Sequence, residues 1–469
     1  MRHLSIAILS ATLLGGIAMA ENVSTTLDDR TDVAVTAYNS GLALVRDVRK
    51  LTLPTGQLNL RFGDVAENIK PETVSLQSLS QAGSIAIYEQ NYEYDLISPQ
   101  KLMEKFVGRE VTLMGLHDSE PFGERQGTLL STNGGPVFQI GGEIYLGHPG
   151  TVVLPEVPDN LIAKPSLIWR LENTQAEQEI VATYLTNGLS WRADYVLTLG
   201  DDETTFDLAG WVTMNNQSGA TYDDAKLKLV AGDVNLAQPD AMLEMAPAPM
   251  AARAMSAEDM QAKEEAFAEY HLYTIPFRTT IKQNQSKQVS LLQASGATLR
   301  KVYELRGRNY YYFNVLDEQL GLNPEAVLVF DNEEENQLGM PLPAGTMRIY
   351  QPDSEGMLQF AGEDRIEHTA TKEEVRLTMG DAFDIVADRR QTDFKKISAN
   401  VFETAFEIEI RNRKKSPVTV DVIEPMVANW RVVESSHEHT KRAAFTLQFA
   451  IDVAADSTET LTYRVRISR

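Results

Sequence analysis

Two histidines, His437 and His439 in the segment SSHEHTKR, are spaced as two ligands of a metal site could be. Residues two apart on a β-strand face the same side, so both imidazoles could bind one cation together with a carboxylate. The helical His-Glu-x-x-His pattern of zinc hydrolases is absent, and no third ligand is identifiable nearby. We therefore interpret the segment as a polar turn or an exposed strand and assign it no metal.

Two acidic stretches allow other chemistries. Residues 331–336, DNEEEN, gather oxygen ligands suited to calcium, but the alternation and glycine of an EF-hand loop are missing. A solvated acidic loop is the better interpretation. Asp223 and Asp224 could serve acid/base cleavage of a glycan, although neighbours on a strand point to opposite sides.

A methionine-dense stretch, residues 237–270, could bind Cu(I) through thioethers. Its first part is rich in alanine and proline, which is typical of a linker, and Ser256 begins a capping sequence that predicts a helix through Tyr270. Methionines that pack on a neighbouring sheet would explain the composition equally well. Five of the 15 methionines lie here: Met242, Met245, Met250, Met255 and Met260.

Signals for covalent catalysis and for phosphate-binding loops are missing. The chain has no cysteine and no Gly-x-Ser-x-Gly motif, and none of its seven histidines has a recognisable catalytic context. The glycines of GGPVFQIGG flank a strand and lack nucleotide-binding spacing. We assign no catalytic residue, no metal and no cofactor. With 43 basic and 66 acidic residues, a net charge of −23 also argues against a nucleic-acid partner.

The first 20 residues have the pattern of a secretory signal peptide. Arg2 supplies the positive start, residues 4–17 are apolar, and Ala18-Met19-Ala20 gives a small-x-small cleavage site. We therefore predict a periplasmic protein, free or loosely associated with the envelope. Later uncharged stretches are too polar and glycine-rich to be transmembrane spans. Without cysteines neither disulfides nor a lipid anchor can form, so burial alone must stabilise the fold.

Period-two alternation of apolar and polar residues runs through most of the chain and predicts antiparallel sheets. In LTYRVRIS, for example, Leu461, Tyr463 and Val465 share one face. Within NGLSWRADYVLTLG the same rule makes Trp191 a core anchor, and it puts Arg192 and Asp194 on the opposite face, where they can pair in water. The fold class is therefore all-β and multi-domain, with few short helices.

Seven segments follow from the turn signals and composition. Ser98, Pro99 and Gly108 mark a short helix that leads into five compact strands, as in an SH3-like or Sm-like barrel, and three tryptophans accompany immunoglobulin-like strands. The segments are a signal peptide (1–20), an N-terminal β domain (21–96), the helix and barrel (97–155), the first part of a β-sandwich (156–236), the linker and helix (237–270), a β region continuing the sandwich (271–371) and a C-terminal β-sandwich (372–469).

Five ordered motifs resemble a family of secreted bacterial β-rich proteins of unknown function, distantly related to the mucoidy inhibitor proteins. They are NGLSWRADYVLTL, LAGWVTMNNQSGATYDDAKLKLVAGDVN, EYHLYTIPFRTTIKQNQSKQVSLL, LGMPLPAGTMRIYQPD and GDAFDIVADRR. The resemblance runs from about Ile168 to the C-terminus and implies an envelope protein. It brings no established catalytic residues, and the chain has less coiled-coil helix than the mucoidy inhibitors.

Our main hypothesis is a non-enzymatic, monomeric or weakly associating scaffold or interaction module of the cell envelope, whose edge strands beside the linker contact another envelope protein. The alternative is a carboxylate-dependent polysaccharide hydrolase. It would need two acidic side chains at roughly 5 to 9.5 Å in a groove lined by aromatics such as Tyr310, Tyr311 and Tyr312. Sequestration of copper or calcium is a third possibility.

Overall fold

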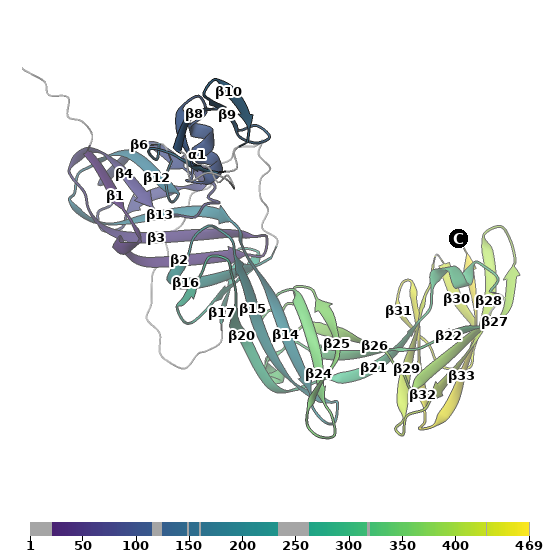
Figure 1. The fold of residues 1–469 in the computed structure, drawn as a ribbon. Coiled ribbons are helices and arrows are strands. Elements are labelled where there is room, and N and C mark those ends of the chain that lie inside the picture. Colours follow the sequence, from purple (N-terminus) through teal and green to yellow (C-terminus); the bar gives the residue numbers. More distant parts are fainter. Residues whose placement is uncertain are drawn as a thin grey trace, which may run out of the picture.

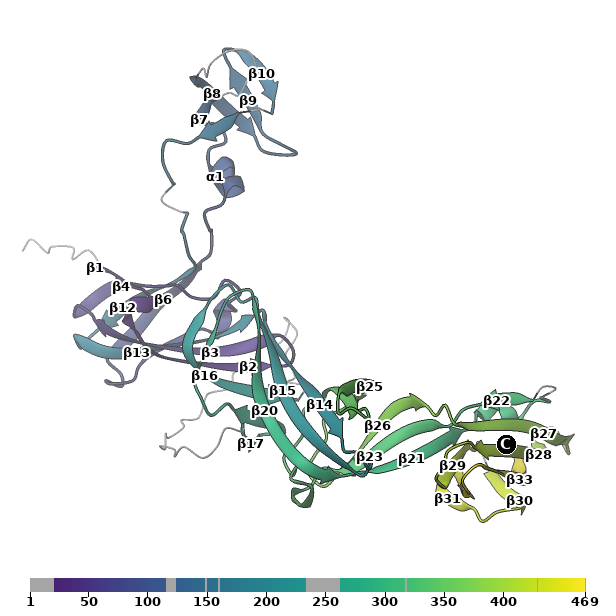
Figure 2. The same cartoon turned by 60° about the horizontal axis from the view of Figure 1, so that its bottom comes forward.

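The computed structural model describes residues 21–114, 124–147, 150–158, 161–232, 262–316, 319–427 and 429–468. Over these residues the protein is all-β, with several sheets and one α-helix, α1 (Pro99–Lys105). Figures 1 and 2 show an elongated arrangement in which the sheets follow one another. The predicted all-β, multi-domain class is therefore confirmed. Four short 3-10 turns complete the described elements: η1 (Leu27–Asp29), η2 (Pro71–Thr73), η3 (Asn309–Tyr312) and η4 (Glu334–Asn336).

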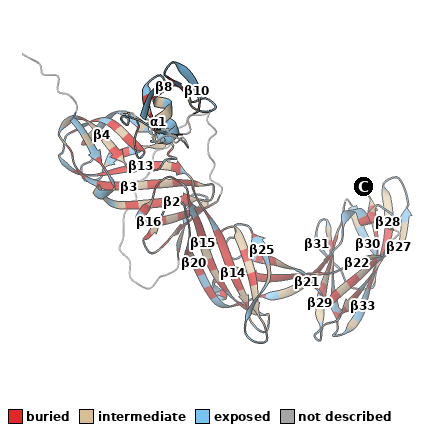
Figure 3. Ribbon diagram, viewed as in Figure 1, coloured by how far each residue is buried: buried red, intermediate tan, exposed pale blue. Residues whose placement is uncertain are grey.

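Three sheets enclose the largest core, which runs along the buried sides of their strands (Figure 3). The first has the order β1 (Glu21–Thr25), β4 (Gly56–Gly63), β12 (Ser166–Asn173) and β6 (Ile85–Glu93). The second has the order β17 (Lys263–Phe267), β18 (Tyr270–Thr274), β16 (Tyr222–Ala231), β2 (Arg30–Tyr38), β3 (Leu42–Thr52), β13 (Glu177–Asn187) and β5 (Ser75–Ser78), with β19 (Thr279–Ile281) beside β16. The third has the order β20 (Gln285–Thr298), β15 (Thr205–Asn216), β14 (Leu189–Leu199), β24 (Gly345–Pro352) and β25 (Leu358–Ile366).

These sheets mix strands from distant parts of the sequence. β12 pairs with β4 and β6, and β13 pairs with β3, so strands of segments 21–96 and 156–236 share sheets. Parallel pairing also joins β16 to β2 and β14 to β24, beside the predicted antiparallel pairs. Long-range pairing therefore combines stretches that are separate in the sequence.

Trp191 is a core residue, as its alternation predicts. It is 4% exposed, and its indole N–H donates to the carbonyl of Ala37 at 3.1 Å. Arg192 and Asp194 do pair, with Nε and Oδ2 3.2 Å apart, but Asp194 is not in water: its side chain is 9% exposed. Thr213 and Arg348 also donate to it, because β15 and β24 flank β14 in the sheet and place these side chains on the same face.

The helix α1 leads into a small five-stranded sheet that projects from the rest of the molecule (Figure 2). The hydroxyl of Ser98 accepts a hydrogen bond from the Lys101 N–H, so the predicted cap is present. The described strands leave the sheet unclosed, and its assignment to the SH3 or Sm class stays a prediction. The order is β10 (Glu143–Leu146), β9 (Val137–Ile140), β8 (Glu124–Ser131), β7 (Glu110–Met114) and β11 (Thr151–Val153).

Two further sheets enclose a separate C-terminal core. The six-stranded sheet has the order β26 (Glu374–Asp381), β23 (Glu325–Asp331), β21 (Arg300–Arg306), β29 (Val418–Pro425), β32 (Thr446–Val453) and β31 (Thr440–Ala443). The five-stranded sheet has the order β22 (Leu320–Leu322), β27 (Ile385–Lys396), β28 (Val401–Asn412), β33 (Ser457–Ser468) and β30 (Asn429–Ser435). The six-stranded sheet contributes to both large cores, and Met379 on β26 packs against both.

The helix predicted from Ser256 to Tyr270 is wrong where the structure describes it. Lys263–Phe267 form β17, which pairs with β18, and Tyr270 begins β18. The good helix formers of KEEAF are overridden because pairing with β18, whose Leu272 and Tyr273 are buried, stabilises an extended strand. The methionines of this segment and the predicted signal peptide lie outside the described residues.

In the part of the chain that the structure describes, no helix combines the length and the apolar character needed to cross a membrane.

Candidate functional site

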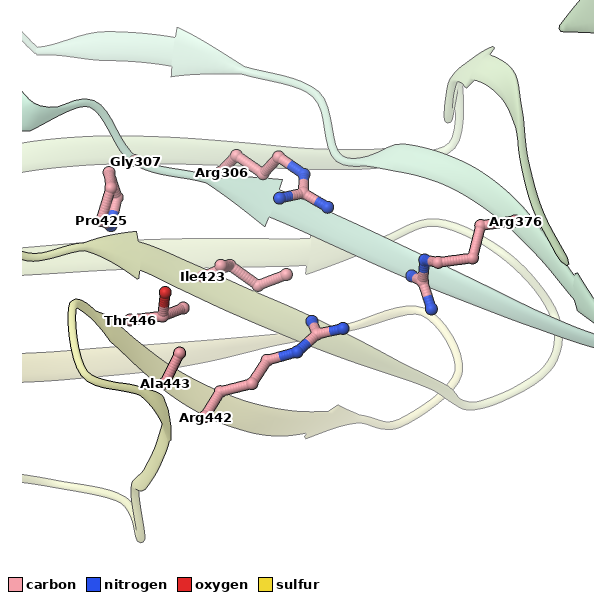
Figure 4. Close-up of a pocket in the computed structure, with 8 residues that line it drawn as sticks. All are labelled: Arg306, Gly307, Arg376, Ile423, Pro425, Arg442, Ala443 and Thr446. Carbon is pink, nitrogen blue, oxygen red and sulfur yellow. The ribbon is translucent and has the colours of Figure 1, made fainter. Parts of the chain in front are cut away.

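A pocket of about 550 Å³ lies on the six-stranded sheet. Three of its lining residues are arginines, and none is acidic. Figure 4 shows the guanidinium groups of Arg306, Arg376 and Arg442 directed toward a common space from three sides. We call this site the arginine pocket; its other lining residues are Gly307, Ile423, Pro425, Ala443 and Thr446.

Each arginine comes from a different strand. On β21, Tyr303 and Leu305 pack into the C-terminal core. Successive residues of a strand alternate between its faces, so Glu304 and Arg306 point to the opposite face. Arg376 lies on β26 and Arg442 on β31, at the two edges of the sheet. The pocket therefore depends on the order of all six strands.

Glu304 is the counter-charge behind the pocket. Its side chain is 1% exposed and accepts hydrogen bonds from Arg306 and Arg376, while Arg442 Nη1 lies 4.0 Å away. Farther out, Glu374 pairs with Arg376 at 2.9 Å and with Arg300 at 2.5 Å, and Glu325 lies 3.9 Å from Arg306. Four arginines and three glutamates thus leave one net positive charge, in a chain whose formal net charge is −23.

Gly307 separates the pocket from a second charged group inside the core. A Cβ at this position would overlap the carboxylate of Glu424, so only glycine allows this close approach. Glu424 accepts hydrogen bonds from Arg389 and Tyr312, and the side chains of Glu424 and Arg389 are fully buried. Tyr463 accepts from Arg389 at 3.2 Å. We call Arg389, Glu424, Tyr312 and Tyr463 the closed charge cluster.

Burial and the Glu424 charge determine the state of the closed charge cluster. Burial, followed by the nearby Glu424 carboxylate, holds the pKa of Tyr312 well above its usual value. Tyr312 therefore stays a protonated donor, and the guanidinium of Arg389 stays charged opposite Glu424. This cluster is a satisfied structural group, apart from Arg389 Nε, which has no hydrogen-bond partner among the described residues.

The arginine pocket offers positive charge and N–H donors. Guanidinium groups have no acceptor and stay charged, so they bind but do not transfer protons near neutral pH. Burial raises the pKa of Glu374, yet the hydrogen bond from Arg376 and the charge of Arg300 outweigh burial, and the net pKa is lowered. A glycosidase acid needs a raised pKa. Glu374 is therefore not poised as a proton donor.

The histidines of SSHEHTKR do not converge on a common point. His437 Nε2 lies 3.4 Å from Glu459, and its Nδ1 is 2.8 Å from Ser436 Oγ. The exposed His439 packs its ring against Phe449, with centroids 5.9 Å apart. The described residues contain no group of three or more side chains placed to hold a metal ion.

The acidic segment 331–336 is only partly a solvated loop. Asn332 and Asn336 are buried, and the Asn332 amide donates to the carbonyls of Met340 at 2.9 Å and Ala370 at 3.0 Å. Thr298 donates to Asn336 through both its N–H and its hydroxyl. The expectation missed these two asparagines because Ala370 and Thr298, which help to bury them, each lie 38 residues away in the sequence.

The residues expected for polysaccharide hydrolysis do not form a groove. Asp223 and Asp224 are exposed at a bulge in β16, where Asp224 has a φ of +47°. Tyr310 is 50% exposed, but Tyr311 and Tyr312 are buried in the C-terminal core. The three tyrosines therefore do not line the groove that the hydrolase alternative would need, because the turn η3 directs two of them inward.

Sequence reasoning missed the arginine pocket. The alternation of Tyr303 and Leu305 with Glu304 and Arg306 indicates that these two residues of opposite charge share one face of the strand. No sequence signal connects them with Arg376 and Arg442, which lie 72 and 138 residues after Glu304.

Comparison with known proteins assigns no relative: no protein-family model matches the chain, and no characterised protein matches it significantly. The resemblance to the secreted β-rich family therefore stays a prediction.

Proposed function

We propose that the protein is an exported, non-catalytic interaction module of the bacterial cell envelope. The observation that carries this proposal is the open edge of the eight-stranded sheet. Among the described strands, β17 forms a ladder with β18 alone. Just before β17, the N–H of Ala262 donates to the carbonyl of Leu291 on β20 at 3.2 Å, so the edge is covered there and its open part lies farther along, around Ala266. An open edge presents backbone N–H and C=O groups that can pair with a strand of a partner.

The register of β17 identifies the groups that face outward. A two-residue turn, residues 268–269, joins Phe267 to Tyr270, and such hairpins close on a hydrogen-bonded pair. Hydrogen-bonded and non-bonded pairs alternate from there, which makes Ala266 opposite His271 a non-bonded pair. The N–H and C=O of Ala266 thus point to the open edge.

Export and a binding role draw on several further observations. The apolar N-terminal pattern ends at Ala20, and β1 begins at Glu21. The arginine pocket supplies charge and donors suited to binding. No observation specifically favours the hydrolase alternative, since the tyrosine groove that it needs is not formed.

Cross-linking in the native envelope tests the proposal with one matched pair of variants. Ala266→Pro removes the outward N–H, whereas Ala266→Ser keeps it. The wild type and Ala266→Ser should capture the same envelope protein, and Ala266→Pro should lose it. Repeated recovery of the wild type alone, or a cytoplasmic chain that keeps residues 1–20, would contradict the proposal.

A further inference from the structure

The arginine pocket has a built anion-binding geometry that strand pairing at β17 does not use. Its three guanidinium groups converge, and Arg306 and Arg376 are held in place by the buried Glu304. Ordering these long side chains in advance reduces the entropy that a ligand must otherwise offset. The site remains accessible, because the side chains of Arg306, Arg376 and Arg442 are 54%, 29% and 44% exposed.

From this geometry we infer that the arginine pocket binds the phosphate group of a phosphomonoester. A phosphomonoester offers three acceptor oxygens and carries about −1.5 to −2 charges at neutral pH. Three guanidinium groups match three oxygens, whereas a carboxylate has two. The net positive charge around Glu304 favours such an anion, although the chain as a whole repels anions.

The remaining lining determines what else the ligand carries. Ile423, Pro425 and Ala443 give the pocket an apolar side, and Thr446 adds a hydroxyl. A volume of about 550 Å³ exceeds that of a bare phosphate and leaves room for a sugar-sized or glycerol-sized group. A soluble sugar phosphate and the headgroup of a phosphomonoester lipid share this chemistry, so the pocket recognises the phosphate and packs against the group next to it.

Arg442 is the position at which to test the site. Its guanidinium lies 4.0 Å from Glu304, so its replacement removes little that holds the fold together. Arg413 is a matched control: its side chain is 52% exposed and lies 3.5 Å from Asp456, away from the pocket lining. Arg442→Gln removes the charge, and Arg442→Lys keeps the charge but not the several N–H donors of the guanidinium group. Arg413→Gln changes the net charge of the protein by the same amount as Arg442→Gln.

Binding is measured at low ionic strength in two arms, calorimetry with glucose 6-phosphate and flotation with phosphatidylcholine vesicles that contain or lack phosphatidic acid. Arg442→Gln should weaken binding about ten- to hundredfold, with Arg442→Lys between it and wild type and Arg413→Gln unchanged. Loss in the first arm identifies a soluble ligand, and loss in the vesicle arm alone identifies a lipid. Absence of binding in both arms, or equal loss in Arg413→Gln, overturns the inference. The outcome does not depend on the edge-strand proposal, because these variants leave β17 unchanged.

Discussion

The arginine pocket and the closed charge cluster lie on opposite faces of one sheet and use the same residue types to different ends. Ile423 lines the pocket, while its neighbour Glu424 points to the other face and pairs with Arg389. The guanidinium of Arg389 packs against the rings of Tyr311 and Phe406, and its side chain is fully buried. Glu304 is also buried, but the three arginines around it reach solvent, with side chains 29% to 54% exposed. Access to solvent, and not residue type, separates a structural ion pair from a potential binding site.

Arg389→Met should give the largest effect, because it leaves the Glu424 carboxylate buried without a counter-charge. We expect a loss of about 3–5 kcal/mol in the free energy of unfolding, measured by urea denaturation. Arg390→Met is the matched control, since Arg390 is 59% exposed and pairs with Glu407; it should cost about 0–1 kcal/mol. Equal losses in the two variants would remove the distinction between the clusters.

The double variant Arg389→Met/Glu424→Leu sharpens this test. Both charges are then absent, so much of the stability lost in Arg389→Met should return. A double variant that is no more stable than Arg389→Met would mean that packing, and not the uncompensated charge, caused the loss.

Gly307→Ala tests the thin boundary between the two clusters. The added methyl group would overlap the Glu424 carboxylate and should cost about 1–3 kcal/mol in unfolding free energy. Gly321→Ala is the control, because its Cβ would meet only Asp388 Oδ1, at 3.7 Å. If the two variants unfold at the same urea concentration, Gly307 does not separate the clusters as described.

Glu304→Gln tests the counter-charge of the arginine pocket. The amide keeps an acceptor oxygen for Arg306 and Arg376 but removes the charge that balances them, and we expect a loss of about 1 kcal/mol in unfolding free energy. The more positive pocket should also bind glucose 6-phosphate more tightly. Glu374→Gln, at a side chain that is 38% exposed, should show a smaller effect on both measurements. If neither variant binds glucose 6-phosphate more tightly than wild type, the charge of Glu304 does not limit anion binding in the pocket.

The smallest effect is expected at Asp393, on the solvent-facing side of the C-terminal sheets. Hydrogen bonds from Lys395 at 2.8 Å and Arg464 at 2.7 Å lower its pKa to about 2. Because the folded pKa lies below the unfolded value of about 3.9, the carboxylate stabilises the protein above pH 4 and loses this contribution as the pH falls toward 2.

Urea midpoints at several pH values check this prediction. Asp393→Asn should be less stable than wild type at pH 7 and should converge with it near pH 2. Asp456→Asn serves as the control, because Asp456 is 83% exposed and lies 3.5 Å from Arg413. A difference for Asp393→Asn that stays constant from pH 7 to pH 2 would rule out a charge effect.

The elements that the sequence predicted correctly are those whose signals are local. The alternation of β33 places Leu461, Tyr463 and Val465 in the core, and Ser98 caps α1. The failures arise where strand pairing or packing overrides the preference of the residues themselves. β18 draws KEEAF into a strand, and η3 turns Tyr311 and Tyr312 into the core.

The sequence by itself determined the all-β class, the core side of strands such as β14 and β33, and the role of Trp191 as an anchor, because all of these depend on neighbours a few residues apart. Only the tertiary structure decided that β21 lies parallel to β29 and that β26 and β31 are the two edge strands of one sheet. That pairing brings Arg306, Arg376 and Arg442 to one pocket and encloses Arg389 with Glu424. Charged side chains acquire a role from the charges and the solvent around them, and residues far apart in the chain supply both.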